Sequence, residues 1–141
     1  MQHRSARSAL TATLLAPLLA PLAGCGPADE TPAPASCPVA TAVVEHAQPV
    51  SQSERWAATA THVVRGDVAL AAGVTLTIDP CARVTFAQGA SLTAAREGAR
   101  IVAEGTAARP ITFDGVDDAR WSQLAIEHPA SAVIRHARFG H

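Results

Sequence analysis

The sequence predicts an all-β fold for residues 62–141. Apolar residues recur two positions apart in short segments, which places them on one face of a strand. Gly, Pro and Asp residues separate these segments at intervals of about five to ten residues, a spacing typical of all-β chains. In addition, a similar short phrase that begins with Gly returns along the chain. These observations together indicate a series of short, half-buried strands joined by tight turns.

The expected strands follow one another in chain order. Their apolar centres are Val68/Leu70, Val74/Leu76/Ile78, Val84/Phe86, Ile101/Ala103, Ile111/Phe113 and Leu124/Ile126. The turns between them are expected at Gly66-Asp67, Gly73, Asp79-Pro80, Gly89, Gly98, Gly105, Pro110 and Asp114-Gly115. Each strand presents alternate side chains to a core.

A helix over residues 91–108 is the alternative for that segment, because Ala, Arg and Glu are good helix formers. Gly98 and Gly105 interrupt the segment, and each costs about 1 kcal/mol relative to Ala within a helix. No apolar stripe at helical spacing continues across these glycines. We therefore expect strands at Leu92–Ala94 and Arg100–Ala103.

The recurring phrase favours a chain that winds in coils. Gly-Val-Thr-Leu at 73–76 returns as Gly-Ala-Ser-Leu at 89–92 and Gly-Ala-Arg-Ile at 98–101. Short strands of this kind suit a solenoid, in which each strand pairs with the coil above it. A sandwich or barrel built from hairpins is the alternative, but only Asp114-Gly115 offers a suitable two-residue turn.

Longer segments resemble bacterial right-handed parallel β-helix repeat proteins. The phrases that carry the resemblance are Gly73–Phe86, Gly89–Leu92, Val102–Thr106, Arg109–Phe113, Trp121–Ile126 and Val133–Phe139. The resemblance covers about His62–His141 and implies a short solenoid with three sheets. Family members usually run for many more coils and end in a cap, so we expect a short or truncated member. Its open C-terminal coil would be covered by a partner or by self-association.

The N-terminal segment has the order of a signal peptide. A basic region, His3–Arg7, precedes an apolar stretch at residues 9–20, which is too short to cross a bilayer. Leu22–Cys25 follows and resembles the lipobox of bacterial lipoproteins. We expect cleavage after Gly24 and lipid on Cys25, which would anchor the chain firmly to a membrane. The alternative is an ordinary signal peptide in which Cys25 is incidental.

This reading divides the chain into four parts. The expected parts are a lipoprotein signal peptide at 1–24, lipidated Cys25 with a flexible Pro- and Ala-rich linker at 25–36, an N-terminal cap segment at 37–61, and the β-helix repeat domain at 62–141. Gly26 after the cysteine resembles an outer-membrane sorting signal. We therefore expect a lipid-anchored protein of the bacterial cell envelope, at the outer membrane.

Two further cysteines, Cys37 and Cys81, form an even pair in an oxidising compartment. We expect a disulfide between them, with two free thiols as the alternative. In the chain-entropy model, a cross-link over a loop of this length restricts the unfolded state by about 4 kcal/mol. The bond would hold the first segment of the domain against the Asp79-Pro80-Cys81 turn.

The densest acidic cluster is the best candidate for a reactive site. It comprises Asp114, Asp117 and Asp118, with Arg120 beside them. Calcium binding or lyase chemistry would need such groups, but the cluster lacks an Asp-x-Asp-x-Asp-Gly loop. We favour a solvated loop, and we assign no catalytic, cofactor or metal residue.

The histidines do not indicate a site either. His128, His136 and His141 are spaced too widely for a zinc motif, and His46 and His62 are isolated in the sequence.

The composition limits the classes of partner and cofactor that the protein can be expected to bind. The chain has a net charge of −1 and no basic patch, so we expect no nucleic-acid partner and no cofactor. We expect a membrane-anchored lipoprotein with a non-catalytic module that is structural or binds a polysaccharide or protein. The alternative is a polysaccharide lyase- or hydrolase-like β-helix enzyme, or a truncated fragment of one.

Overall fold

The computed structural model describes residues 36–140 and is nearly all β. The predicted signal peptide, Cys25 and all but the last residue of the predicted linker lie outside the described residues, as does His141. The strands are β1 (Ala42–His46), β2 (Glu54–Trp56), β3 (Ala60–Val64), β4 (Asp67–Ala69), β5 (Thr75–Ile78), β6 (Arg83–Phe86), β7 (Ser91–Ala94), β8 (Arg100–Glu104), β9 (Ile111–Gly115), β10 (Gln123–Ile126), β11 (Ser131–Arg135) and β12 (Ala137–Phe139). A short 3-10 helix, η1 (Val116–Asp118), follows β9.

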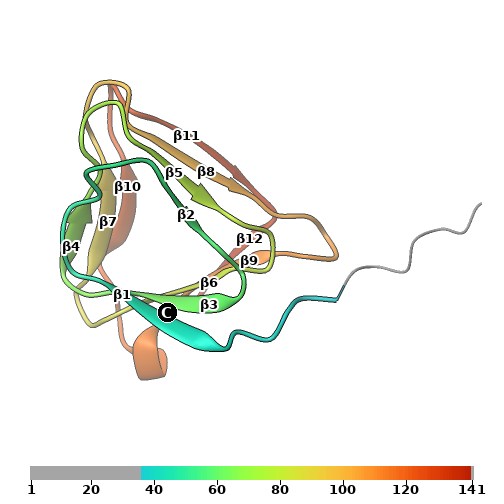
Figure 1. The fold of residues 1–141 in the computed structure, drawn as a ribbon. Helices are drawn as coiled ribbons and strands as arrows, with labels where there is room; N and C mark the ends of the chain where they lie inside the picture. Colours follow the sequence, from blue (N-terminus) through green and yellow to red (C-terminus); the bar gives the residue numbers. More distant parts are fainter. Residues whose placement is uncertain (1–35, 141) are drawn as a thin grey trace, which may run out of the picture. The chain divides into compact units, whose positions relative to one another are not determined.

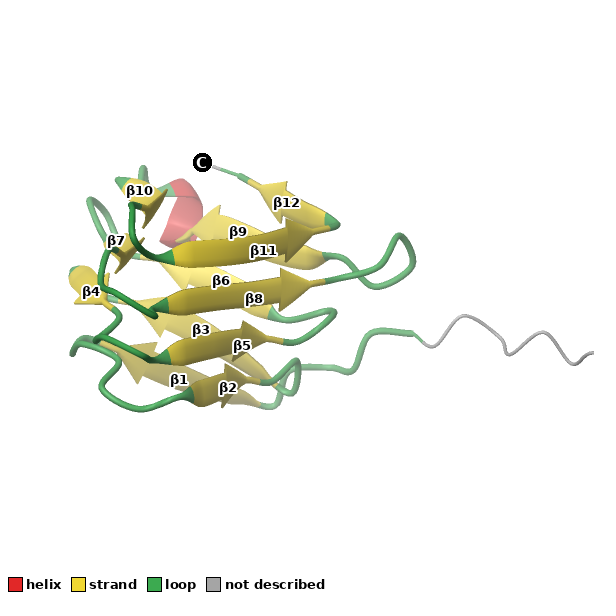
Figure 2. Cartoon of the chain, turned by 90° about the horizontal axis from the view of Figure 1, so that it is seen from above, coloured by secondary structure: helices red, strands yellow, loops and turns green. Residues whose placement is uncertain are grey.

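Within residues 36–140 the strands form three sheets, in which every pair is parallel. Their orders are β1-β3-β6-β9-β12, β4-β7-β10 and β2-β5-β8-β11. From β3 to β12, every third strand belongs to the same sheet, so the chain visits the three sheets in rotation. Figure 1 shows the sheets around a common interior, and Figure 2 shows their strands stacked in layers.

The pairing register stacks inward side chains in rows. On the five-stranded sheet, His62 pairs with Val84 and Val84 with Phe113. On the four-stranded sheet, Leu76 pairs with Ile101. All five residues are buried, since every second side chain of a strand points to the same face. The core is therefore a set of ladders that run across the strands.

Turns recur at equivalent places in successive layers. Gly73 and Gly98 both have a left-handed backbone, with φ near +70°. A Cβ added to Gly98 would lie 3.1 Å from the Cα of Gly73, so the two turns are in close contact. Both positions were predicted as turns, and both need glycine for this backbone conformation.

The strand predictions from Val68 onward agree with the structure. The segment 91–108, for which a helix was the alternative to strands, contains β7 and β8 and no helix. The strands β1, β2, β3, β11 and β12 were not among the expected strands, and Asp114 and Gly115, expected as a turn, lie within β9. β1 is an edge strand whose two adjacent valines are exposed, so its sequence lacks alternation. Residues 37–61, expected as a cap segment, thus contribute strands to two of the sheets, and the expected boundary at residue 62 falls inside β3.

None of the helices in the described part of the chain is long and apolar enough to cross a membrane.

Candidate binding groove

The outward face of the five-stranded sheet carries a groove. Because alternate side chains point outward, two outward rows cross the strands β3, β6 and β9. One row contains Thr61, Arg83 and Thr112, which are register partners on adjacent strands. The other contains Val63, Thr85 and Asp114, which are also partners. These two rows form the floor of the groove.

The groove has two connected halves. The first has a volume of about 400 Å³ and is bounded by the loop after β9; its lining residues are Thr61, Val63, Arg65, Arg83, Thr85, Thr112, Asp114, Gly115, Val116 and Asp117. The second, of about 440 Å³, lies beside Cys37–Ala40 and Cys81. Both halves are lined by Thr61, Arg83 and Thr112. Arg83 therefore stands where the two halves meet.

Some of the charged side chains at the groove have hydrogen-bond partners within the protein, and Arg83 has none among the described residues. Arg65 Nη2 donates a hydrogen bond of 2.6 Å to Oε1 of Glu45, and this bond lowers the pKa of the Glu45 carboxyl. Asp114 Oδ1 accepts a hydrogen bond of 2.9 Å from the N–H of Gly115. Arg83, by contrast, is exposed and has no hydrogen bond or ion pair with any described residue. Its guanidinium is free to bind a ligand.

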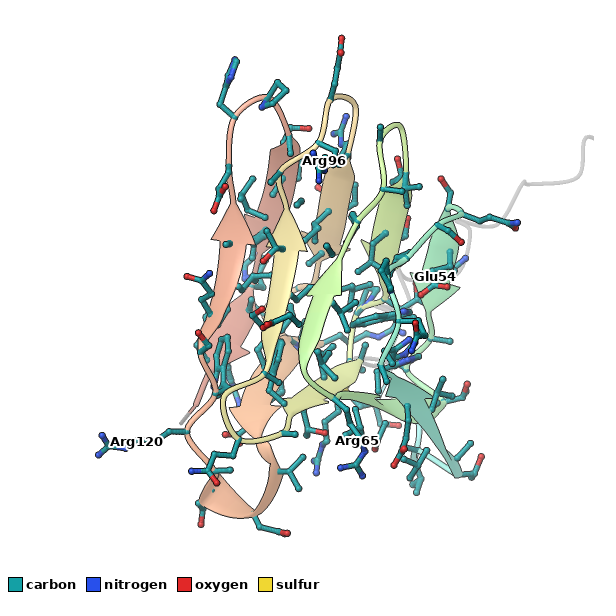
Figure 3. The ribbon with its side chains drawn as sticks, turned by 90° about the vertical axis from the view of Figure 1, so that its left-hand side faces the viewer. Glu54, Arg65, Arg96 and Arg120 are labelled. Atoms are coloured by element: carbon teal, nitrogen blue, oxygen red, sulfur yellow. A yellow bond between two sulfur atoms is a disulfide. The ribbon has the colours of Figure 1, made fainter. Side chains whose placement is uncertain are left out.

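The structure divides the predicted acidic cluster. Asp114 and Asp117 line the groove, together with Arg65 and Arg83. Asp118 and Arg120 are exposed and do not line it. Figure 3 shows Arg120 extending away from the ribbon. Among the residues that the structure describes, no group of three or more His, Cys, Asp or Glu side chains is arranged to hold a metal ion.

The predicted cysteine pair is present as a disulfide. Cys37 and Cys81 are joined, with their Cα atoms 5.4 Å apart. Cys81 has a left-handed backbone, with φ of 72°, in the turn between β5 and β6. The disulfide holds the segment before β1 along one side of the groove, and so it helps to shape the second half.

A second cluster was missed by the sequence analysis. His46, Trp56 and His62 stack in the interior at the β1 end, with ring centroids of His46 and Trp56 4.2 Å apart. Glu54 lies beside them, at the other end of the domain from Arg120 (Figure 3). The two histidines are 16 residues apart, so only the pairing of β1 with β3 brings them together.

The chain was compared with protein-family models, with curated proteins and with solved structures, and no match was found.

Proposed function

We propose that the chain is a lipid-anchored lipoprotein of the bacterial cell envelope. Its domain is a short right-handed parallel β-helix that serves as a non-catalytic structural or binding module for a polysaccharide or a protein. In this proposal the lipid on Cys25 anchors the chain to a membrane, Gly26 after the cysteine serves as the sorting signal for the outer membrane, and a partner or a second copy covers the last coil. The outward groove around the unpaired Arg83 is the observation that carries the binding function.

The rotation of strands among three parallel sheets supports the β-helix. Neighbours within a sheet are three strands apart from β3 to β12, as expected where each turn of a coil supplies one strand to each sheet. The stacked turns at Gly73 and Gly98 also fit coils in register. Three sheets are what the sequence resemblance implies.

The state of the carboxylates supports binding over catalysis. A general acid or base must be positioned within hydrogen-bond reach of the reacting group. In the groove, Asp114 is engaged by a backbone N–H, and Asp117 is exposed on η1. The fold alone does not distinguish a binding protein from an enzyme, because one fold can serve many functions.

A polysaccharide lyase or hydrolase is the second candidate. One observation favours it, namely that Asp114 and Asp117 share the groove with Arg65 and Arg83. An activity screen on acidic and neutral polysaccharides separates the two candidates. We expect no product. If the wild type forms product and both Asp114→Asn and Asp117→Asn abolish it, the groove is a catalytic site and the non-catalytic binding function is wrong.

The anchor is tested by labelling. Cells that express the full chain are fed a clickable palmitate, and the membrane fraction is examined for labelled protein. We expect label in the wild type and none in Cys25→Ser, whereas Cys37→Ser retains it. A wild-type protein without label, recovered outside the membrane fraction, would contradict the lipoprotein assignment.

A further inference from the structure

We propose that the outward row Thr61–Arg83–Thr112–Arg138 binds a polysaccharide that carries carboxylate groups, with the sugar chain running across the strands. This inference rests on the proposed binding function and names its ligand. It assigns the groove around Arg83, together with Arg138, which lies on β12 outside the groove lining, to an acidic polysaccharide and not to a protein.

The spacing of the row suits a repeating ligand. Thr61 pairs with Arg83, Arg83 with Thr112, and Thr112 with Arg138, so each residue stands on the next strand of the sheet. Adjacent strands are about 4.8 Å apart, which puts the two arginine positions about 10 Å apart. This is close to the length of one disaccharide unit in an extended sugar chain. A polysaccharide with at least one carboxylate in each disaccharide, such as a polymer of uronic acids, would meet one arginine per disaccharide.

Both arginines are available to a ligand. Arg83 and Arg138 are exposed, and neither makes a hydrogen bond or an ion pair with a described residue. Arg55 and Arg65, in contrast, donate to Asp79 and Glu45 at 2.6 Å. A free guanidinium binds a carboxylate through two parallel hydrogen bonds.

The remaining members of the row are threonines. Thr61 and Thr112 lie on either side of Arg83, and each hydroxyl can donate or accept a hydrogen bond with a sugar hydroxyl. No aromatic side chain lines either half of the groove. Recognition would thus depend on charge and hydrogen bonds and not on stacking against sugar rings, which favours an acidic over a neutral glycan.

The lining also argues against a protein ligand. Protein interfaces depend on a few large aromatic or apolar anchors that fill pockets. The apolar lining of the groove is limited to small or medium side chains of Val, Ala and Pro. In the neighbouring outward row, the carboxylate of Asp114 would repel an anionic chain and so favour a path over the arginines, whereas Glu45 in that row is already paired with Arg65.

The test uses the full-length chain, purified in detergent, and oligosaccharides of polygalacturonate or alginate at low salt. Calorimetry should detect binding to the acidic oligosaccharides and none to dextran oligosaccharides of the same length. Arg83→Gln and Arg138→Gln should each weaken binding roughly tenfold, as expected for loss of one charged hydrogen-bonded contact. Arg100→Gln is the matched control, since Arg100 is an exposed strand residue on a different sheet.

Three results would overturn the inference. They are failure to bind any acidic oligosaccharide, equal weakening by Arg100→Gln, and tighter binding of polyglutamate than of the sugars. The last result would assign the row to an acidic protein. Thermal unfolding of each variant shows that it is folded. Labelling of Cys25 with palmitate is independent of these binding measurements. A protein that is labelled but binds no acidic oligosaccharide would therefore contradict the ligand proposal and not the lipoprotein proposal.

Discussion

The Nε2 atom of His46 lies 3.0 Å from the Nδ1 atom of His62, inside the first layer of the domain. Nε2 of His62 lies 3.1 Å from the carbonyl oxygen of Ala57, which can only accept a hydrogen bond. His62 must therefore donate from Nε2 and accept at Nδ1 from the N–H of His46. The remaining nitrogen of His46 faces Glu54 Oε1 at 3.8 Å. A proton added to Nδ1 of His62 would break the bond between the rings.

This arrangement predicts that stability falls in mild acid. Burial lowers the pKa of both His46 and His62, an effect that the carboxylate of Glu54 partly opposes. Below the ordinary histidine pKa of about 6.5, the unfolded chain binds more protons than the folded chain. The stabilisation is therefore fully present above that pH and is lost as the pH falls through the lower, folded-state pKa values.

Urea unfolding, followed by tryptophan fluorescence at about pH 7.5 and about pH 5, measures the effect. The free energy of unfolding should fall with pH in the wild type, and fall less in His46→Gln. His136→Asn is the control, because His136 is an exposed turn residue. An equal pH dependence in wild type and His46→Gln would contradict the prediction.

Removal of the disulfide should destabilise the domain. The bond closes a loop with a sequence separation of 44 residues, so its loss gives the unfolded chain more freedom. We expect the double variant Cys37→Ser/Cys81→Ser to lose about 2–4 kcal/mol in the free energy of unfolding. As a check on the bond, the denatured, unreduced Cys25→Ser chain should contain no titratable thiol. Two thiols per chain would show that the bond is not formed.

Two glycine turns provide a matched pair for packing between layers. Gly89 and Gly98 have the same left-handed backbone, with φ of 71° and 70°. A Cβ at Gly89 meets nothing within 4 Å, whereas one at Gly98 meets the backbone of Gly73. Gly89→Ala should cost about 1–2 kcal/mol for the backbone alone, and Gly98→Ala about 1–3 kcal/mol more. Equal melting temperatures for the two variants would show that the turns are not in contact.

The last layer should promote association. Strands β10, β11 and β12 each lie at the end of their sheet in the described part of the chain, and Phe139 there is 54% exposed. Unpaired strand edges beside apolar side chains favour pairing with another chain. Sedimentation of the full chain in detergent should show a mass that rises with protein concentration. Phe139→Asp should suppress the rise, and a wild-type monomer at every concentration would refute self-association.

The regular part of the fold could be predicted because its signal is local. Val84 and Phe86 are two positions apart and both are fully buried, so the alternation in sequence directly reports the inward face. In β1 the signal is lost, because Val43 and Val44 are adjacent and Val44 is exposed at the end of the stack. Alternation is expected where one face of a strand is buried, and β1 is exposed along nearly its whole length, so no buried face imposes it.

The groove and the histidine cluster could not be predicted because they depend on register. Thr61, Arg83 and Thr112 are more than twenty residues apart from one another in sequence, and only the pairing of β3, β6 and β9 aligns them. The acidic cluster was found because Asp114, Asp117 and Asp118 are close in sequence. Closeness in sequence could not show that Arg120 lies outside the groove that Asp114 and Asp117 line.

The Cys37–Cys81 bond also decides how the domain would respond to mechanical force. A pull on the chain before Cys37 passes through the two sulfur atoms to Cys81, so residues 38–80 carry no tension. These residues include β1 to β5, which are thus shielded from being peeled off one by one. Load enters the domain at the turn before β6, where the strand is flanked by β3 and β9. Under a reducing agent, the same pull would act on β1 first.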